Sequence, residues 1–197
     1  MMCGLVCFAG PNAGTGTTVR KMMRPLKHRG PDSEGLQIFQ DCELGHLRLS
    51  IIDLRSRSDQ PMRSSHGNLW LVFNGEIYNF KELKTELADY QFQTHSDSEV
   101  ILAAYDKWGA DCVHRFNGMF AFVIYDISKK AIFAARDRFG IKPLFYSVRE
   151  RDLFLASEAK AILATRDCTP NKDYLQEYIS SGKRLKGHES CFNEISQ

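Results

Sequence analysis

MMCGLVCFAG, residues 1–10, places Cys3 close to the start of the chain and directly ahead of an apolar run. Residues 3–9 have the length and composition of a buried strand, which the turn-forming segment GPNAGTG at 10–16 ends. Two interpretations of Cys3 are open. A cysteine in a strand is most often a small buried apolar residue. A cysteine at the very end of a chain can instead use its own α-amine, with a pKa of about 8, as the base that activates its thiol.

The composition is that of a globular protein without a polyanionic partner. The 197 residues include 26 basic and 24 acidic side chains, for a formal net charge of +2, without a run of like charges, which argues against nucleic acid or a membrane surface as a partner. No apolar segment approaches the roughly 20 residues of a membrane span, and the N-terminus lacks a signal-peptide layout, so we expect a cytoplasmic protein. The cysteines and histidines form no CxxC or HxxxH pair, so we expect neither a metal site nor a disulfide framework.

The hydrophobic periodicity predicts both strands and helices. Ser96, with Glu99 three residues later, forms a capping-box pattern ahead of an amphipathic helix, and Asn74 with Gly75 is expected to end a strand. Runs of strands with grouped helices favour an α+β fold with antiparallel sheets. The predicted strands are 3–9, 35–39, 43–52, 68–73, 119–126, 131–136, 144–147 and 153–156, and the predicted helices are 17–26, 80–87, 96–108, 158–163 and 173–181.

Six segments together carry a family pattern: MCGLVCFAG (2–10), HRGPDSEG (28–35), LGHLRLSIIDL (44–54), FNGEIYN (73–79), SDSEV (96–100) and RDRFGIKPLFY (136–146). In this order and spacing they resemble the class II glutamine amidotransferase domain, an N-terminal-nucleophile hydrolase, and HRGPD points to the glutamine-hydrolysing asparagine synthetases. The resemblance implies an αββα four-layer sandwich of two antiparallel sheets flanked by helices. It also implies an amidotransferase domain at 1–165, followed at 166–197 by a C-terminal helix and a linker toward a synthetase domain outside the chain.

The same resemblance implies hydrolysis of the glutamine side-chain amide to glutamate and ammonia through a thioester on Cys3. Asn74 and Gly75 match the family's oxyanion donors, although Asn-Gly is also a common hairpin turn. Arg48 matches the binder of the substrate carboxylate, and by itself would be a solvent-facing strand residue. The remaining implied contacts are Glu76 and Asp97 to the substrate ammonium, backbone groups from Leu49 to Ile52 along the pocket, and Arg29 either at the substrate or pinning a loop.

The resemblance further implies glutamine as substrate, and a C-terminal ATP-dependent synthetase domain as the partner that receives the ammonia. No cofactor is expected in this domain, and ATP and Mg are expected only in the synthetase domain. A homo-oligomer is a further option. No pyrophosphate-binding SGGxDS motif occurs in these residues.

Two alternatives follow from the chain itself. Relatives begin Met-Cys, whereas here Met1 and Met2 both precede Cys3, and a blocked Cys3 amine would leave a catalytically inactive domain for glutamine binding or docking. The other alternative keeps the glutaminase and changes the acceptor, because nothing in residues 1–197 contacts the acceptor. Whether the two methionines are removed therefore decides between enzyme and binding domain.

Overall fold

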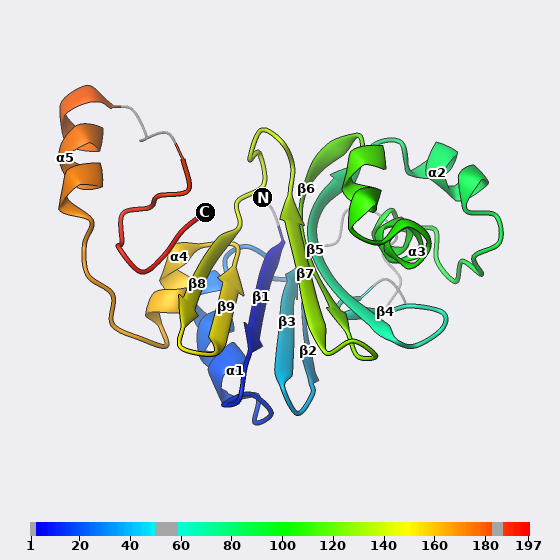
Figure 1. The fold of residues 1–197 in the computed structure, drawn as a ribbon, viewed down its shortest axis with the longest axis horizontal. Helices are drawn as coiled ribbons and strands as arrows, with labels where there is room; N and C mark the ends of the chain where they lie inside the picture. Colours follow the sequence, from blue (N-terminus) through cyan, green and yellow to red (C-terminus); the bar gives the residue numbers. More distant parts are fainter. Residues whose placement is uncertain (1–2, 50–58, 183–186) are drawn as a thin grey trace.

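The computed structural model describes residues 3–49, 59–182 and 187–197, and its centre is a pair of stacked antiparallel sheets (Figure 1). Sheet 1 has the order β2-β3-β1-β9-β8, and sheet 2 has the order β4-β5-β6-β7. The strands of sheet 1 are β1 (Gly4–Ala9), β2 (Ser33–Ile38), β3 (Cys42–Arg48), β8 (Phe145–Arg149) and β9 (Asp152–Ala156). Those of sheet 2 are β4 (Met62–Arg63), β5 (Leu69–Ile77), β6 (Gly118–Asp126) and β7 (Ala131–Arg136).

Helices cover the outer face of each sheet, so the molecule has four layers (Figure 1). The outer face of sheet 1 carries α1 (Thr17–Met23), the 3-10 turn η1 (Arg24–Leu26) and α4 (Ala159–Leu163). The outer face of sheet 2 carries α2 (Phe80–Glu86), α3 (Ser98–Trp108) and the 3-10 segment η3 (Gly109–Arg115). The predicted αββα sandwich is therefore confirmed.

Period-2 alternation assigns each strand residue to an inner or an outer face. Leu5 and Cys7 of β1, Leu44 of β3 and Val72 of β5 belong to the apolar layer between the sheets. Their outward neighbours pack under the helices, as Val6 does against α1. Each fully buried aliphatic side chain contributes roughly 1.5–3 kcal/mol to folding, which explains why three clusters of such residues can hold four layers together.

At one end of the sandwich the same inner-face positions change from apolar to polar. Continuing β1 backward from Leu5 reaches Cys3, and continuing β3 forward from Leu44 reaches His46 and Arg48. Continuing β5 forward from Val72 reaches Asn74 and then Glu76. The register brings these ends together, because Gly4 pairs with Leu47 and the His46 ring bonds to the Phe73 carbonyl at 3.0 Å.

One strand boundary differs from the prediction. β5 does not end at Phe73 but runs through Asn74 and Gly75 to Ile77, paired with β6 as far as Gly118. The strand does not end at Asn74 and Gly75, as predicted, because β6 offers a continuous partner. Gly75 is needed for a different reason, since a Cβ at this position would lie 2.2 Å from the Met119 carbonyl oxygen.

The predicted capping box is also wrong. α3 begins at Ser98, and Ser96 Oγ accepts the Ser98 N–H at 3.2 Å. The Glu99 carboxylate turns back past Ser96 to the N–H groups of Gln93 at 2.8 Å and Thr94 at 2.7 Å. The preceding loop supplies better-placed donors, so Glu99 anchors that loop instead of closing the helix end.

Other predicted elements appear with shifts at their ends. β2 begins at Ser33 rather than residue 35, and β3 spans Cys42–Arg48, whereas positions 50–52 of the predicted strand lie outside the described residues. α5 (Lys172–Ser181) confirms the last predicted helix. The division of the chain at 165/166 stays a prediction.

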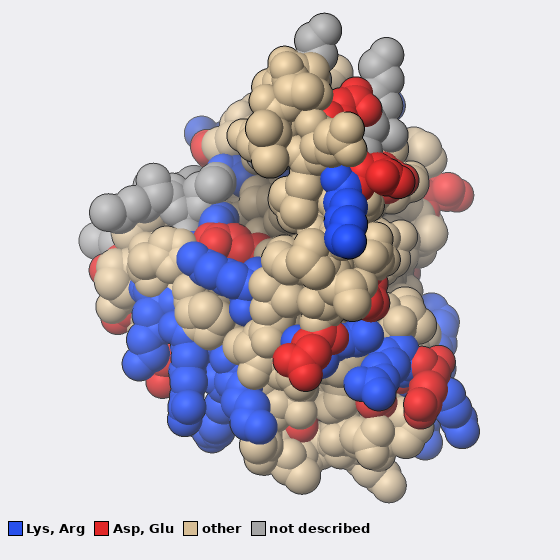
Figure 2. All heavy atoms as spheres, turned by 90° about the vertical axis from the view of Figure 1, so that its left-hand side faces the viewer, with Lys and Arg blue, Asp and Glu red and all other residues tan. Residues whose placement is uncertain are grey.

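The C-terminal residues return to the sandwich. Ser196 exchanges backbone hydrogen bonds with Tyr146 of β8, at 2.8 and 2.9 Å. Ile195 is 1 % exposed and belongs to the apolar cluster beneath α1 and α4. On the face that carries α5, Lys and Arg side chains gather at the lower left, and Asp and Glu side chains are scattered (Figure 2).

The described residues contain neither a candidate membrane-spanning helix nor a candidate metal cluster. None of the helices there is both long and apolar enough to cross a membrane. Over the same ranges, no group of three His, Cys, Asp or Glu side chains is placed to hold a metal ion.

Candidate active site

The Cys3 thiol sits in a backbone cradle at the polar end of the sandwich. The Leu49 N–H donates to Cys3 Sγ at 3.3 Å, and the Leu49 carbonyl accepts from the thiol at 3.6 Å. Burial raises the pKa of the Cys3 thiol, while the bond to Leu49 and the positive charges of Arg48, Arg29 and Lys142 act in the opposite direction. The site therefore combines desolvation of the thiol with groups that favour its thiolate.

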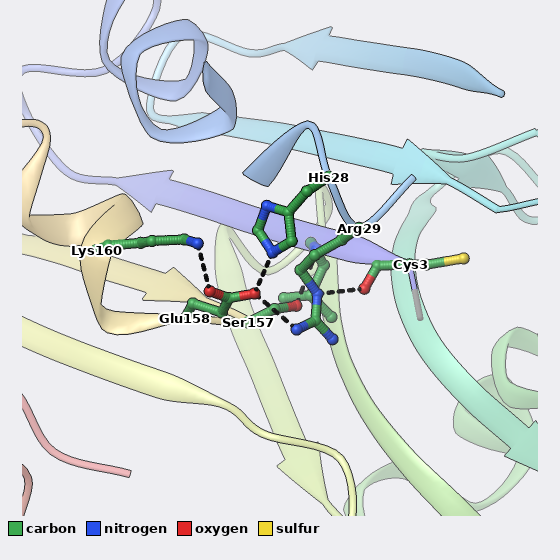
Figure 3. A network of polar contacts seen from close by, with 7 residues as sticks. Cys3, His28, Arg29, Ser157, Glu158 and Lys160 are labelled. Atoms are coloured by element: carbon green, nitrogen blue, oxygen red, sulfur yellow. Dashed lines mark hydrogen bonds and ion pairs between the residues drawn. The ribbon is translucent and has the colours of Figure 1, made fainter. Parts of the chain in front are cut away.

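Arg29 holds the backbone of Cys3 (Figure 3). Its Nε donates to the Cys3 carbonyl at 3.0 Å, and its Nη1 donates to Glu158 Oε1 at 2.8 Å. Glu158 is held in turn by Lys160 Nζ at 2.9 Å and by His28 Nε2 at 3.0 Å. Burial would raise the pKa of the Glu158 carboxyl, but the bonds from Arg29 and Lys160 outweigh it, and the pKa is lowered.

The neighbouring Ser157 holds the next part of β1. Its Oγ accepts the Leu5 N–H at 3.0 Å, and its own N–H donates to the Leu5 carbonyl at 3.0 Å. Ser157 and Glu158 thus form a clamp, one acting on Leu5 directly and the other on Cys3 through Arg29. Such a clamp fixes the direction in which the Cys3 side chain leaves the strand.

Asn74 carries a hydrogen-bond donor without an acceptor. The residue is 2 % exposed, and among the described residues its side-chain Nδ2 has no hydrogen-bond partner. Leaving a buried amide unpaired costs about 1–3 kcal/mol, which a fold tolerates where a ligand completes the bond.

The pairing register indicates that the Gly75 N–H points away from β6. Phe120, opposite Gly75, turns both backbone groups toward Asp137, donating to its Oδ2 at 3.2 Å and accepting its N–H at 2.7 Å. In an antiparallel ladder, when the backbone N–H and C=O of one residue point away from the partner strand, those of the residue opposite also point away. The backbone groups of Gly75 therefore point away from β6. Two other N–H groups of β5 point the same way. The Phe73 N–H donates to Gln60 Oε1 at 2.6 Å, and the Ile77 N–H donates to Asp97 Oδ2.

Two carboxylates lie close together beside these donors. Asp97 is 4 % exposed, and its Oδ2 accepts the Ile77 N–H at 2.9 Å. Burial raises the pKa of the Asp97 carboxyl, the bond from Ile77 lowers it, and the nearby charge of Glu76 raises it further. A buried acid whose pKa is raised beside a second acid is suited to a cationic group.

The basic side of the site comes from β3. Arg48 is 7 % exposed and forms an ion pair with Asp59. Two positions earlier, His46 donates from Nε2 to the Phe73 carbonyl and so ties sheet 1 to sheet 2 next to Asn74. Burial, assisted by the Arg48 charge, lowers the pKa of His46 to about 4, although the Phe73 bond opposes the shift.

The structure brings most of the predicted site residues to one end of the sandwich. Cys3, Leu49 and Arg29 are in hydrogen-bond contact, directly or through the Cys3 carbonyl. Glu76 and Asp97 interact with each other, and Arg48 acts on Cys3. Asn74 and Gly75 lie on β5 beside Glu76, whereas Ile52 lies outside the described residues.

Three further residues support the site without a signal in the sequence. Gln60 accepts the Phe73 N–H, Glu158 orients Arg29, and the charge of Lys142 favours the thiolate form of Cys3. The pattern of RDRFGIKPLFY indicates an architectural role, and that of the SEAK segment around Glu158 only a helix start. No spacing rule connects these positions with Cys3, since they are up to 155 residues away along the chain and meet it only through sheet packing.

Comparison with known proteins agrees with this geometry. A family model described as "Glutamine amidotransferase domain" matches residues 2–197. A putative glutamine-hydrolyzing asparagine synthetase 2 of Methanocaldococcus jannaschii is 40% identical over 186 residues, covering 83% of this chain and 36% of that protein. The glutamine-hydrolyzing asparagine synthetase 1 of Bacillus subtilis is 40% identical over 165 residues, covering 82% of this chain and 26% of that protein.

A solved structure shares the fold. The glutamine phosphoribosylpyrophosphate amidotransferase of B. subtilis, complexed with ADP and GMP, matches with a TM-score of 0.69 at 22% identity, over 83% of this chain and 43% of that chain. The chain spans 36% and 26% of the length of the two synthetases above. On the family match and these relatives, the chain belongs to the glutamine amidotransferase domain family.

Proposed function

We propose that this chain hydrolyses the side-chain amide of glutamine to glutamate and ammonia, with Cys3 as nucleophile. The observation that carries the proposal is the buried Asn74 amide, which has no partner among the described residues and lies at the same end of the sandwich as the cradled Cys3 thiol. A donor kept free inside a protein is what a developing oxyanion requires.

The proposed reaction has two steps. Cys3 Sγ forms a bond to the amide carbon, the carbonyl electron pair moves to oxygen, and the thiol proton passes to the α-amine. The oxyanion is held by Asn74 Nδ2 and the Gly75 N–H. Its collapse breaks the C–N bond, and the α-ammonium gives its proton to the leaving NH₂ group, which departs as ammonia. Water, deprotonated by the same amine, then attacks the thioester and regenerates the Cys3 thiol as glutamate forms.

The proposed substrate contacts use the charges already described. The Arg48 guanidinium, which Asp59 pairs as a counterion, binds the α-carboxylate of glutamine. Glu76 and Asp97 receive the α-ammonium, which relieves the unfavourable proximity of two acids. Backbone groups of Leu49 contribute to the pocket, and Arg29 acts by holding the Cys3 carbonyl.

The ammonia, in this proposal, passes to an ATP-dependent domain of the asparagine-synthetase type. Support comes from the two asparagine synthetases above, of which this chain spans 36% and 26%. Residues 1–165 would carry the glutaminase, and 166–197 would lead toward that domain. ATP and Mg belong to the synthetase reaction, since glutamine hydrolysis as written uses only Cys3, its amine and water.

The experiment compares the chain as given with one that begins at Cys3, measuring glutamate release from glutamine. We expect turnover only when Cys3 is the first residue, because only then is the α-amine free, and none in Cys3→Ala. Intact mass of the protein from its own host shows whether Met1 and Met2 are removed. A folded chain that begins at Cys3 and binds glutamine without turnover would instead be an inactive binding domain.

A second variant tests the oxyanion assignment. Asn74→Ala is expected to lower kcat by about 10²- to 10³-fold with little change in glutamine affinity, because the lost bond forms in the transition state. Affinity is measured by calorimetry in the Cys3→Ala background, so that no turnover interferes. An unchanged kcat would contradict the role of Asn74.

A further inference from the structure

The N-terminal end of β1 lacks a complete backbone partner in β9. The ladder between the two strands ends at Val6, because the chain leaves the sheet after β9 and begins α4 at Ala159. In an antiparallel ladder, the two residues of a hydrogen-bonded pair exchange both of their N–H···O bonds. By this register Leu5 lies opposite Ser157, whereas Cys3 would lie opposite Ala159, which belongs to the helix. The residue that carries the thiol is therefore beyond the backbone support of β9.

Side chains replace the backbone bonds that β9 does not supply. Ser157 still donates its N–H to the Leu5 carbonyl, but the Leu5 N–H donates to Ser157 Oγ instead of a carbonyl. The Cys3 carbonyl, which would accept a backbone N–H in a continued ladder, accepts from Arg29 Nε at 3.0 Å. In Figure 3 the Cys3 carbonyl oxygen is turned toward Arg29 and the sulfur points the other way. Arg29 therefore acts on the backbone of the nucleophile.

Glu158 holds the Arg29 guanidinium in the position from which it reaches Cys3. Its Oε1 accepts from Arg29 Nη1 at 2.8 Å, while Nε of the same guanidinium donates to the Cys3 carbonyl. The Arg29 side chain is 8 % exposed, and burying a cation to this extent is unfavourable without a paired carboxylate. Lys160 Nζ, at 2.9 Å, fixes the other carboxylate oxygen of Glu158. The planar, rigid guanidinium thus links the position of Glu158 to that of Cys3.

We propose, resting on the glutaminase function above, that Glu158 is a positioning residue for the nucleophile: through Arg29 it holds the Cys3 backbone, and so fixes the thiol relative to the oxyanion donors. In the active form of that function Cys3 is the first residue, so no preceding residue holds it, and chain ends fray unless they are tied down. A displacement of about 1 Å can lower the rate of a reacting group by about 10²-fold. Because Glu158 acts on the Cys3 backbone and not on glutamine, its effect belongs in kcat and not in KM.

The experiment is a double-mutant cycle in the chain that begins at Cys3, with glutamate release from glutamine as the readout. Its variants are Glu158→Ala, Arg29→Met and the two combined. Glu158→Gln is the conservative change, because its side-chain oxygen can still accept from Arg29. Glu86→Ala is the matched control, since it removes a carboxylate that pairs with Arg115 at 3.1 Å on the outer face of sheet 2.

We expect kcat to fall about 10²-fold in Glu158→Ala, with KM unchanged. The fall should be smaller in Glu158→Gln, which keeps the acceptor and loses only its charge, and absent in Glu86→Ala. Because Glu158 acts through Arg29, the combined variant should be no slower than Arg29→Met.

Amide hydrogen exchange of the N-terminal peptide gives a second readout, which needs no turnover. Exchange at Gly4 and Leu5 should be faster in Glu158→Ala than in the parent chain, because the start of β1 opens more often when Arg29 is no longer held. Glu86→Ala should leave the exchange of this peptide unchanged.

An unchanged kcat or unchanged N-terminal exchange in folded Glu158→Ala overturns the proposal. A rise in KM alone also overturns it, since Glu158 would then act on the substrate. Fully additive effects of Glu158→Ala and Arg29→Met would show that Glu158 acts independently of Arg29, which contradicts the proposal as well.

Should Glu158→Ala fail to fold, the same cycle is made with Glu158→Gln, whose smaller loss of kcat should disappear in the Arg29→Met background. Failure of the glutaminase function is separate. Faster N-terminal exchange in Glu158→Ala without turnover in the parent chain supports the hold on Cys3 and contradicts the proposed reaction.

Discussion

Asp97 has two effects on the fold, one stabilising and one destabilising. As an acid at the start of α3 it accepts the Ile77 N–H and so joins that helix to β5. Its burial beside Glu76 nevertheless raises the pKa of its carboxyl. The fold therefore holds an acid whose charged form is unfavourable, and a bound ammonium would remove that cost.

Substituting asparagine, as Asp97→Asn, separates these effects. Because the folded chain binds the Asp97 proton more tightly than the unfolded chain, the wild type loses stability as pH rises from the unfolded pKa, about 3.9, through the raised folded value. The amide of the variant does not titrate, and its oxygen can still accept the Ile77 N–H. We expect an unchanged or higher melting temperature at pH 7, and a glutamine KM at least tenfold higher, from scanning fluorimetry and steady-state kinetics. A lower melting temperature would show that the carboxylate stabilises the fold without substrate.

At the scale of elements, β3 and β5 meet across the two sheets at His46. The Phe73 carbonyl requires a donor, so Nε2 carries the proton, and the ring is neutral because burial lowers its pKa to about 4. Gln60 accepts the Phe73 N–H. Together the two hydrogen bonds fix the position of the β5 backbone at Phe73, directly before Asn74. The two side chains therefore position the proposed oxyanion donors.

This arrangement predicts acid sensitivity. The folded pKa of His46, about 4, lies below the unfolded value of about 6.5, so its neutral form stabilises the fold fully above pH 6.5 and progressively less as pH falls toward 4. The loss is about 2 kcal/mol at pH 5. His46→Gln, whose amide can still donate to Phe73, should lack this component. Urea unfolding at pH 7 and pH 5 measures the difference, and an equal pH dependence in both proteins would contradict it.

For the molecule as a whole, the last eleven residues pack as part of the globular unit. Ile195 lies in the cluster beneath α1 and α4, and Ser196 pairs with β8. Ser147 Oγ donates to the Glu194 carbonyl, a further hydrogen bond between β8 and this segment beside the two of Ser196. The C-terminal segment thus covers apolar surface of sheet 1.

Ile195→Ala tests this packing. Truncating a buried isoleucine leaves a cavity, so unfolding free energy should fall by roughly 2–5 kcal/mol, measured by urea denaturation. Ile179 of α5, which is 81 % exposed, supplies the matched control, and Ile179→Ala should change stability by no more than about 0.5 kcal/mol. Equal effects of the two substitutions would mean that residues 187–197 do not stabilise the sandwich.

The fold was predictable where local pattern and tertiary environment agree. The apolar runs of β1, β6 and β7 and the helical spacing of α3 identified elements that the structure confirms. The strand end predicted at Asn74–Gly75 was wrong because the turn preference of two residues is weaker than pairing with the nine-residue strand β6. The Ser96–Glu99 box failed likewise, since the 93–94 loop offered Glu99 other donors.

The sequence by itself determined the chemistry available: a cysteine close to the start of the chain, an Asn-Gly pair after an apolar run, and the motifs that carry the family resemblance, because residue identity and order need no folding to be read. Only the tertiary structure decided which charges are paired. Arg29 meets Glu158 and Arg48 meets Asp59, whereas Lys142 forms no ion pair among the described residues. The reason is physical: burial and electrostatic interaction depend on distances through space, and sheet packing brings together segments that no sequence spacing relates.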